Sequence, residues 1–238
     1  MPTFVLVHGA WTGAFAFRHV RRLLQAQGHD VFTPSLTGIG DRSHLASPLV
    51  DLRTHVRDVV NVVLYEDLRD IVLIGFSYGG FVVSGAVEHI GDRVKHLVLL
   101  DAFMPEKSGD TVAGLIAGQP SRAPAAINES WLIPPKDRHF DSAEEGAFVS
   151  ARRTAQPAAT FTDPVYLAKP LEDYPFARTY IRATVSEPDA VLGALSRSAL
   201  RALGSPAWIY REIATTHMVA SNRPEELAAM LVKLVTPG

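Results

Sequence analysis

Short apolar runs alternate with amphipathic segments along most of the chain. Continuous runs rich in β-branched residues, typical of strands buried on both faces, occur at residues 3–7, 30–34, 71–76, 94–100, 178–184 and 207–213. Apolar positions at helical spacing occur at residues 17–28, 51–63, 81–90, 189–203 and 224–235. This alternation predicts right-handed crossovers and an α/β fold, with a mainly parallel sheet that carries helices on both faces.

The alternation stops between residues 104 and 178. Nine of the 16 prolines lie in this region, a density that argues against a regular sheet layer. We expect short helices and irregular loops that form an inserted cap over the active site. Residues 1–103 and 179–238 are expected to form the core, because 238 residues fit one α/β domain with an insertion.

The strand at residues 71–76 ends at a serine with glycines two positions before and after it. These residues are Gly75, Ser77 and Gly79. A serine hydroxyl attacks a carbonyl only if it stands clear of its own backbone, which requires a tight strand-to-helix turn with small neighbours. The following helix directs its N-terminal N–H groups to where negative charge develops during acyl transfer. Ser77 is therefore the candidate nucleophile.

A serine hydroxyl needs a general base at neutral pH. Of the nine histidines, His217 lies in the loop just past the last expected strand, and the site of an open parallel sheet lies outside the carboxyl ends of its strands. The other histidines are expected to be structural or exposed, and His8 is expected to brace its loop. The chain has no cysteine and no H-x-H or H-E-x-x-H pattern, so neither a metal site nor a cofactor is expected.

The oxyanion of an acyl-transfer reaction needs two N–H donors. In a turn of this kind one donor is the N–H of the residue after the nucleophile, here Tyr78. The second comes from the loop after the first strand, where Ala10 is the expected donor. Loss of one such donor typically raises the barrier by about 2.7–4 kcal/mol.

These motifs together resemble the α/β-hydrolase superfamily over essentially the whole chain. The resemblance is carried by HGAW, GFSYGG, LVLLDAF and a C-terminal histidine before a helix. The segments FVLVHGAW, LLDAFMP and YIRAT…HMVASNRPEELAAML are similar to the branch that holds plant methylsalicylate-type esterases, hydroxynitrile lyases and bacterial esterases. The resemblance implies an α/β-hydrolase fold and ester hydrolysis through an acyl-enzyme.

The acid of the expected triad does not lie at the position where this branch carries it. In the plant esterases the resemblance places an aspartate shortly after the strand at residues 178–184, and the matching position here is Ser186. Glu187 and Asp189 are nearby but shifted along the loop. Asp101, at the end of the strand after the nucleophile strand, is where other α/β-hydrolases carry their acid, and it keeps the chain order Ser, Asp, His. We expect Asp101 to be the acid, with Glu187 and Asp189 as alternatives.

The expected substrate is a small hydrophobic or aromatic ester, with Trp11, Phe103 and Trp131 as candidate walls of its pocket. A hydroxynitrile lyase is the first rival. The resemblance implies that such enzymes carry a threonine after the first-strand histidine and a lysine after the catalytic histidine, which bind the substrate hydroxyl and cyanide. Here these positions are Gly9 and Met218. The second rival is a ligand receptor without useful turnover, and the intact serine and histidine argue against it.

The charge composition limits which classes of binding partner are expected. Charged residues make up 20% of the chain and the formal net charge is −2, so neither nucleic acid nor an anionic membrane is expected to bind. A small neutral substrate fits better, and a homodimer is left open. The first strand follows the N-terminus without a basic leader, and no apolar run approaches 18 residues, which predicts a cytoplasmic protein.

Overall fold

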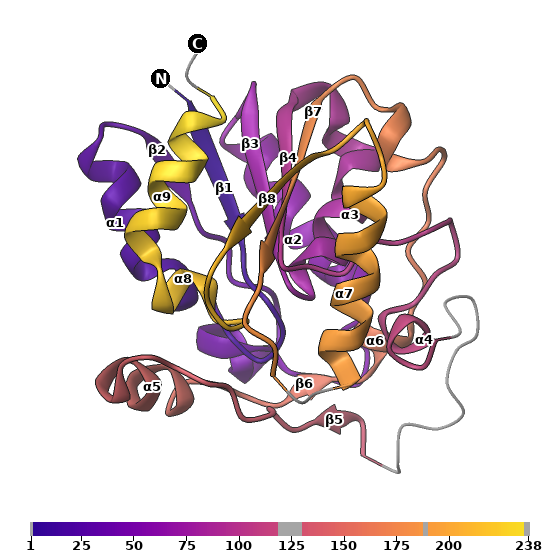
Figure 1. Ribbon diagram of the computed structural model, residues 1–238. Coiled ribbons are helices and arrows are strands. Elements are labelled where there is room, and N and C mark those ends of the chain that lie inside the picture. Colours follow the sequence, from indigo (N-terminus) through magenta and orange to yellow (C-terminus); the bar gives the residue numbers. More distant parts are fainter. Residues whose placement is uncertain (1, 119–129, 188–189, 236–238) are drawn as a thin grey trace.

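The computed structural model describes residues 2–118, 130–187 and 190–235, with the backbone alone for 190–192. Its centre is a six-stranded sheet in the order β2-β1-β3-β4-β7-β8 (Figure 1). The strands are β1 (Thr3–Val7), β2 (Asp30–Phe32), β3 (Ile71–Phe76), β4 (Val94–Leu100), β7 (Ala177–Ala183) and β8 (Ile209–Ile213). Within the described residues every pairing in this sheet is parallel. The expected fold class is confirmed.

Helices cover both faces of the sheet (Figure 1). One face carries α1 (Arg18–Ala26), α8 (Val219–Asn222) and α9 (Pro224–Lys233), and the other carries α2 (Leu52–Tyr65), α3 (Gly79–Ile90) and α7 (Ala190–Leu203). Short 3₁₀ turns are η1 (Ala14–Phe17), η2 (Gly40–Leu45), η3 (Gly91–Arg93) and η4 (Leu171–Asp173). The sheet therefore separates two apolar cores.

Successive side chains of each strand enter opposite cores. In β1, Phe4 and Leu6 belong to the core under α1 and α9, whereas Val5 and Val7 belong to the core under α2 and α3. All four side chains are fully buried. Side chains of a strand alternate between the two faces of a sheet, so a strand between two helix layers must be apolar at every position, which explains the continuous apolar runs in the sequence.

The strand order reverses at β1, since β2 pairs with one edge of this strand and β3 with the other. The loop after β1 and the turn after β3 consequently lie side by side at the carboxyl end of the sheet. Open α/β sheets bind ligands in the crevice at this kind of switch point. The fold thus brings the expected oxyanion loop next to the expected nucleophile.

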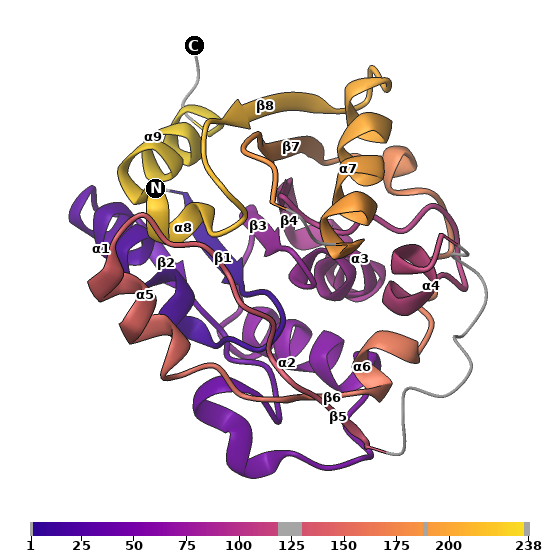
Figure 2. The ribbon, with the colours of Figure 1, turned by 60° about the horizontal axis from the view of Figure 1, so that its bottom comes forward.

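The described residues 104–118 and 130–178 cross the carboxyl end of the sheet (Figure 2). Their described elements are α4 (Val112–Ile116), β5 (Leu132–Ile133), α5 (Ala143–Ser150), β6 (Gln156–Pro157), α6 (Ala159–Thr162) and η4. The antiparallel pair β5–β6 was not expected from the proline density. Among the described residues it has no third strand, and proline is tolerated in such edge strands.

The helix α5 is fastened to α1. Arg18 donates from both terminal nitrogens to the carboxylate of Glu145, and its guanidinium carbon lies 3.7 Å from the ring centroid of Phe148. Charge pairs that are partly buried stabilise a contact more than exposed pairs do, so this contact anchors α5, in the middle of residues 104–178, on the core. None of the described helices is both long and apolar enough to cross a membrane.

Candidate active site

Ser77 stands on a strained turn between β3 and α3. Its φ is +53°, in the left-handed region that non-glycine residues rarely adopt. The turn closes because a Cβ on Gly75 would lie 2.6 Å from the carbonyl oxygen of Gly79, and a Cβ on Gly79 would lie 2.7 Å from the carbonyl oxygen of His8. The two glycines of the motif are therefore required by close backbone packing, and the serine side chain is 7% exposed.

The structure brings Ser77, His217 and Asp101 together from three separate segments. His217 Nε2 lies 3.0 Å from Ser77 Oγ, and His217 Nδ1 lies 2.7 Å from Asp101 Oδ2. Because a carboxylate oxygen only accepts, Nδ1 carries the hydrogen and Nε2 is free to accept from the serine. Both His217 and Asp101 are nearly buried, at 4% and 3% exposure.

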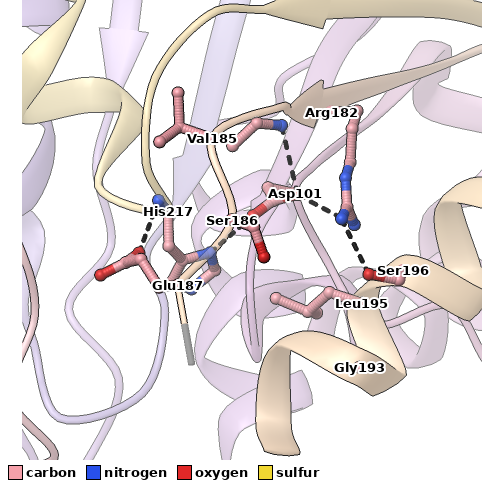
Figure 3. Close-up of a pocket in the computed structure, with 10 residues that line it drawn as sticks. Asp101, Arg182, Val185, Ser186, Glu187, Gly193, Leu195, Ser196 and His217 are labelled. Atoms are coloured by element: carbon pink, nitrogen blue, oxygen red, sulfur yellow. Dashed lines mark hydrogen bonds and ion pairs between the residues drawn. The ribbon is translucent and has the colours of Figure 1, made fainter. Parts of the chain in front are cut away.

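Asp101 is positioned by the strand end that carries it. Its φ is +38°, and its N–H donates to the carbonyl oxygen of Ile181 on β7 over 2.7 Å. The carboxylate oxygen that faces away from His217, Oδ1, accepts from the N–H of Ala183 at 3.3 Å and lies 3.7 Å from Nη1 of Arg182. The two carboxylate oxygens thus have different partners, as Figure 3 shows.

The two alternative acids do not take this place. The Glu187 carboxylate accepts from two backbone N–H groups, that of His217 at 3.0 Å and that of His139 at 3.3 Å. Glu187 therefore holds the loop of the histidine rather than its ring. Asp189 lies outside the described residues.

The loop of His217 is also packed from the side of β3. The ring centroids of His217 and Phe76 are 4.8 Å apart at an interplanar angle of 32°. Met218, the next residue, is buried in the same apolar core as Phe76. The imidazole is thus held between an aromatic ring and the carboxylate of Asp101.

The backbone N–H groups of Ala10 and Tyr78, in the two loops beside Ser77, have no acceptor among the described residues. The next N–H in the first loop, that of Trp11, donates instead to Oε1 of Gln156 at 2.9 Å. Buried backbone N–H groups are rarely left unpaired in proteins. Such a pair of donors next to a nucleophile is what an oxyanion hole requires.

The loop that carries Ala10 is held by residues far along the chain. Trp11, with φ of +63°, is fixed through its N–H by Gln156, through its indole N–H by the carbonyl oxygen of Ile133 at 3.0 Å, and through its carbonyl oxygen by the N–H of Thr154 at 3.0 Å. Gln156 is fully buried. Sequence reasoning missed this residue, because a glutamine 145 positions away leaves no pattern near the loop.

The orientation of the Gln156 amide follows from its neighbours. The Thr160 hydroxyl donates to the carbonyl oxygen of Pro157 at 2.7 Å, so its oxygen accepts from Nε2 of Gln156 at 2.8 Å. The amide oxygen must then face the N–H of Trp11. A fully satisfied buried network of this kind favours one conformation of the loop.

His8 braces the same loop as a neutral imidazole. Its Nε2 accepts from the N–H of Leu36 at 3.0 Å, so the hydrogen sits on Nδ1 and is donated to the carbonyl oxygen of Gly9 at 2.8 Å. Burial lowers the pKa of His8 from 6.5 to about 4. His8 is thus a structural group of the loop.

Tyr78 is fixed by a second buried histidine. His55 Nε2 donates to the carbonyl oxygen of Thr37 at 2.7 Å, which leaves Nδ1 to accept from the Tyr78 hydroxyl at 2.9 Å. Burial lowers the pKa of His55 to about 4 and raises the pKa of Tyr78 well above 10. Both groups are consequently neutral, and the Tyr78 ring stacks on Phe161 with centroids 5.4 Å apart.

The three candidate pocket residues lie in different surroundings. Trp11 is buried, with its ring 5.8 Å from that of Phe161. Phe103 is buried edge-on against Phe81 at 6.4 Å, and its N–H donates to the carbonyl oxygen of Ser77 at 3.1 Å. Trp131 is 40% exposed.

A cavity of about 330 Å³ opens beside the acid end of this arrangement (Figure 3). Residues that line it include Asp101, Arg182, Ser186, Glu187, Ser196 and His217. Ser186, the position matching the acid of the plant esterases, therefore borders the same space as Asp101. Among the described residues no group of three or more His, Cys, Asp or Glu side chains is arranged to hold a metal ion.

The parallel sheet with its strained serine turn after β3 and its histidine after the last strand defines the class of α/β hydrolases. A family model described as the alpha/beta hydrolase family matches residues 4–230, and the chain belongs to this family. A carbendazim-hydrolysing esterase from Nocardioides is 33% identical over 98% of this chain and 100% of that protein.

Two plant proteins of the branch that the sequence resembles also match this chain. The α-hydroxynitrile lyase of Arabidopsis thaliana is 32% identical over 43% of this chain and 40% of that protein. The crystal structure of a methylesterase from Arabidopsis matches with a TM-score of 0.76 at 22% identity, over 99% of both chains. The resemblance to a branch of esterases and hydroxynitrile lyases is confirmed.

Proposed function

We propose that this protein hydrolyses a small carboxylic ester through an acyl-enzyme on Ser77. The observation that carries the proposal is the hydrogen-bonded series from Asp101 Oδ2 through His217 to Ser77 Oγ, with separations of 2.7 Å and 3.0 Å. The esterase from Nocardioides, which matches over its full length, supports the same chemistry. Nucleophile, base and orienting carboxylate are recognised by such geometry rather than by sequence position.

In this reaction His217 takes the proton of Ser77 as Oγ attacks the ester carbonyl. The N–H groups of Ala10 and Tyr78 stabilise the oxyanion, and His217 then gives its proton to the leaving alcohol oxygen. A water molecule attacks the acyl-enzyme by the same route and releases the acid. Asp101 holds the imidazole in the tautomer with hydrogen on Nδ1 and stabilises the imidazolium.

Residues 104–178 are proposed to act as the cap that shapes the acyl pocket. Their described part crosses the carboxyl end of the sheet (Figure 2) and supplies Phe161, whose ring centroid lies 5.8 Å from that of Trp11 and 5.4 Å from that of Tyr78. Aromatic rings on this side support a hydrophobic or aromatic acyl group. Trp131 from the same residues, and Phe103 just before them, remain candidate walls.

The structure also bears on cyanohydrin cleavage. The residue after His217 is the buried Met218 rather than a lysine, and Gly9 leaves the space in front of Ser77 free of a side-chain hydroxyl, since a Cβ there would lie 3.0 Å from Ser77 Cβ. Neither position offers a group for cyanide or for the substrate hydroxyl. Ester hydrolysis is therefore the function that the site supports best.

Rapid mixing with a p-nitrophenyl ester of a short acid tests the proposal. We expect a stoichiometric burst of nitrophenol followed by turnover, and a loss of kcat by about 10⁵–10⁶ in Ser77→Ala, because the nucleophile of a triad acts as a unit with its base. A serine-reactive phosphonate should add its mass to the peptide that contains Ser77.

Ser84→Ala is the matched control. Ser84 is a fully buried serine of the helix that follows the turn, and its hydroxyl donates to the carbonyl oxygen of Gly80 at 2.7 Å. This variant should keep the burst. A burst of unchanged size in Ser77→Ala would contradict the proposed nucleophile.

A further inference from the structure

The oxygen of Asp101 that faces away from the imidazole meets a cation. Oδ1 lies 3.7 Å from Nη1 of Arg182, whereas Oδ2 lies 2.7 Å from His217 Nδ1. The side chain of Arg182 is 22% exposed and that of Asp101 is 4% exposed. A charge pair with this little solvent is screened far less than a surface pair.

The guanidinium is aimed at Asp101 by a residue of α7. Nη2 of Arg182 donates to Oγ of Ser196 at 2.8 Å, as Figure 3 shows. The register partner of Arg182 on β8 is Glu212, which offers a nearby exposed carboxylate, yet the guanidinium reaches Ser196 and Asp101. The arrangement therefore depends on a specific hydrogen bond as well as on general charge attraction.

We propose that Arg182 is a positioning residue, which fixes the Asp101 carboxylate and limits how strongly Asp101 stabilises the protonated form of His217. A cation beside Oδ1 draws negative charge away from the imidazole. The protonated imidazole of His217 is then stabilised less than it would be beside a carboxylate without a cation. This inference rests on the proposed function, since it concerns the same histidine.

Among the described residues, two charged groups adjoin the Asp101–His217 pair. Burial raises the pKa of Tyr180 well above 10, and burial raises the pKa of Tyr210, so both are neutral in the working range. The His139 side chain lies 3.6 Å from Asp141, and Glu212 is exposed on β8. Of the residues that the structure describes, the charged groups left beside the pair are Arg182, on the side of Asp101, and Glu187, whose carboxylate accepts from the His217 N–H.

The test is the pH profile of kcat/KM on a p-nitrophenyl ester. In Arg182→Met the midpoint of the acidic limb should move up by roughly 0.9 to 1.7 pH units, the size expected for a unit charge some 7 Å away at an effective dielectric constant of 20 to 40. Arg182→Lys keeps the charge and should return most of this shift. Glu187→Gln keeps an acceptor for the His217 N–H but removes the anion, so its midpoint should move down.

Ser196→Ala provides a milder variant, because it releases the guanidinium without removing it. A shift in the same direction as that of Arg182→Met, but smaller, is expected. Thermal unfolding shows which variants are folded, and if Arg182→Met is not, the pair Arg182→Lys and Ser196→Ala decides. Acidic limbs that coincide in the wild type and a folded Arg182→Met would overturn the proposal, and so would limbs that coincide in the wild type and Ser196→Ala if Arg182→Met does not fold.

Proton NMR of the His217 ring, assigned by its loss in His217→Asn, gives a readout that does not depend on turnover. Its titration midpoint should shift between wild type and Arg182→Met as the kinetic midpoint does. A kinetic effect without this shift would leave Arg182 a purely structural role and overturn the inference. Full esterase activity in Ser77→Ala would instead overturn the proposed function, so the two failures are distinguishable.

Discussion

The two loops that offer backbone donors to the site are built in opposite ways. The turn after β3 enters α3 at once and is closed by glycines that pack against adjacent backbone. The loop after β1 enters no α-helix until Arg18 and is held by groups remote in sequence, among them Leu36 and Gln156. The turn after β3, which we call the locally fixed half of the site, is thus held by local chain geometry. The loop after β1, which we call the remote half, is held by long-range hydrogen bonds.

This difference separates two ways of damaging the protein. A change in the turn after β3 removes the reacting groups themselves or strains the backbone. A change in the partners of the loop after β1 leaves every reacting group in place and misaligns one donor. Variants on the two sides should therefore differ in how they divide their effect between kcat, KM and stability.

Asp101 belongs to the locally fixed half, since it ends the strand beside β3. In Asp101→Asn we expect kcat to fall by about 10⁴, because the amide no longer holds the imidazole tautomer or stabilises the imidazolium. Steady-state kinetics on a nitrophenyl ester would measure the loss. Glu187→Gln and Asp189→Asn are the comparison variants, and each should stay within about tenfold of wild type, a loss below about 1.4 kcal/mol. Near-wild-type turnover in Asp101→Asn would remove the assignment of the acid.

Gln156 belongs to the remote half. In Gln156→Leu the Trp11 N–H loses its acceptor, and we expect kcat to fall by about 10², the lower end of the loss for an oxyanion donor, with KM changed by less than about threefold. Thr160→Val removes only the group that orients the Gln156 amide and should cost less. Equal kcat in the wild type and a folded Gln156→Leu would show that the loop keeps its shape without this contact.

The locally determined half was predictable from sequence. The strands, the helices that cover them, Ser77 and its glycines follow from periodicity and spacing, because each depends on residues within a few positions. The structure also brings Asp101 and His217 to Ser77 as the topology of a parallel sheet implies. Parallel order alone placed these strand ends at one edge.

The remote half was not predictable. The β5–β6 pair joins residues 132–133 to 156–157, and such short pairings have no periodic signal. Gln156 contacts Trp11, which lies 145 positions earlier in the chain. Arg182 contacts Asp101, on a different strand end far earlier in the chain. A buried glutamine and a strand arginine look the same in sequence whether they hold a catalytic loop or only fill space.

His8 makes the remote half sensitive to acid. Its pKa is lowered by burial to about 4 in the folded protein, against about 6.5 in the unfolded chain. The unfolded state therefore takes up the proton first as the pH falls, and the free energy of unfolding declines between pH 6.5 and 4, by about 2 kcal/mol from pH 8 to pH 5 for this group. Urea unfolding at the two pH values measures the decline.

In His8→Gln, which does not titrate, the decline between pH 8 and pH 5 should be smaller by about the same 2 kcal/mol. His44→Gln changes an exposed histidine and should reproduce the wild-type decline. Amide hydrogen exchange in residues 8–13 at pH 5 should accelerate before exchange in α3, because protonation of His8 breaks a bond made by a residue of this loop, that from the Leu36 N–H. His55, the buried histidine beside the turn after β3, binds the Tyr78 side chain and not the backbone of that turn. An equal acceleration in both segments would show that the two loops open as one unit. The two loops would then differ in how they are held but not in how they respond to acid.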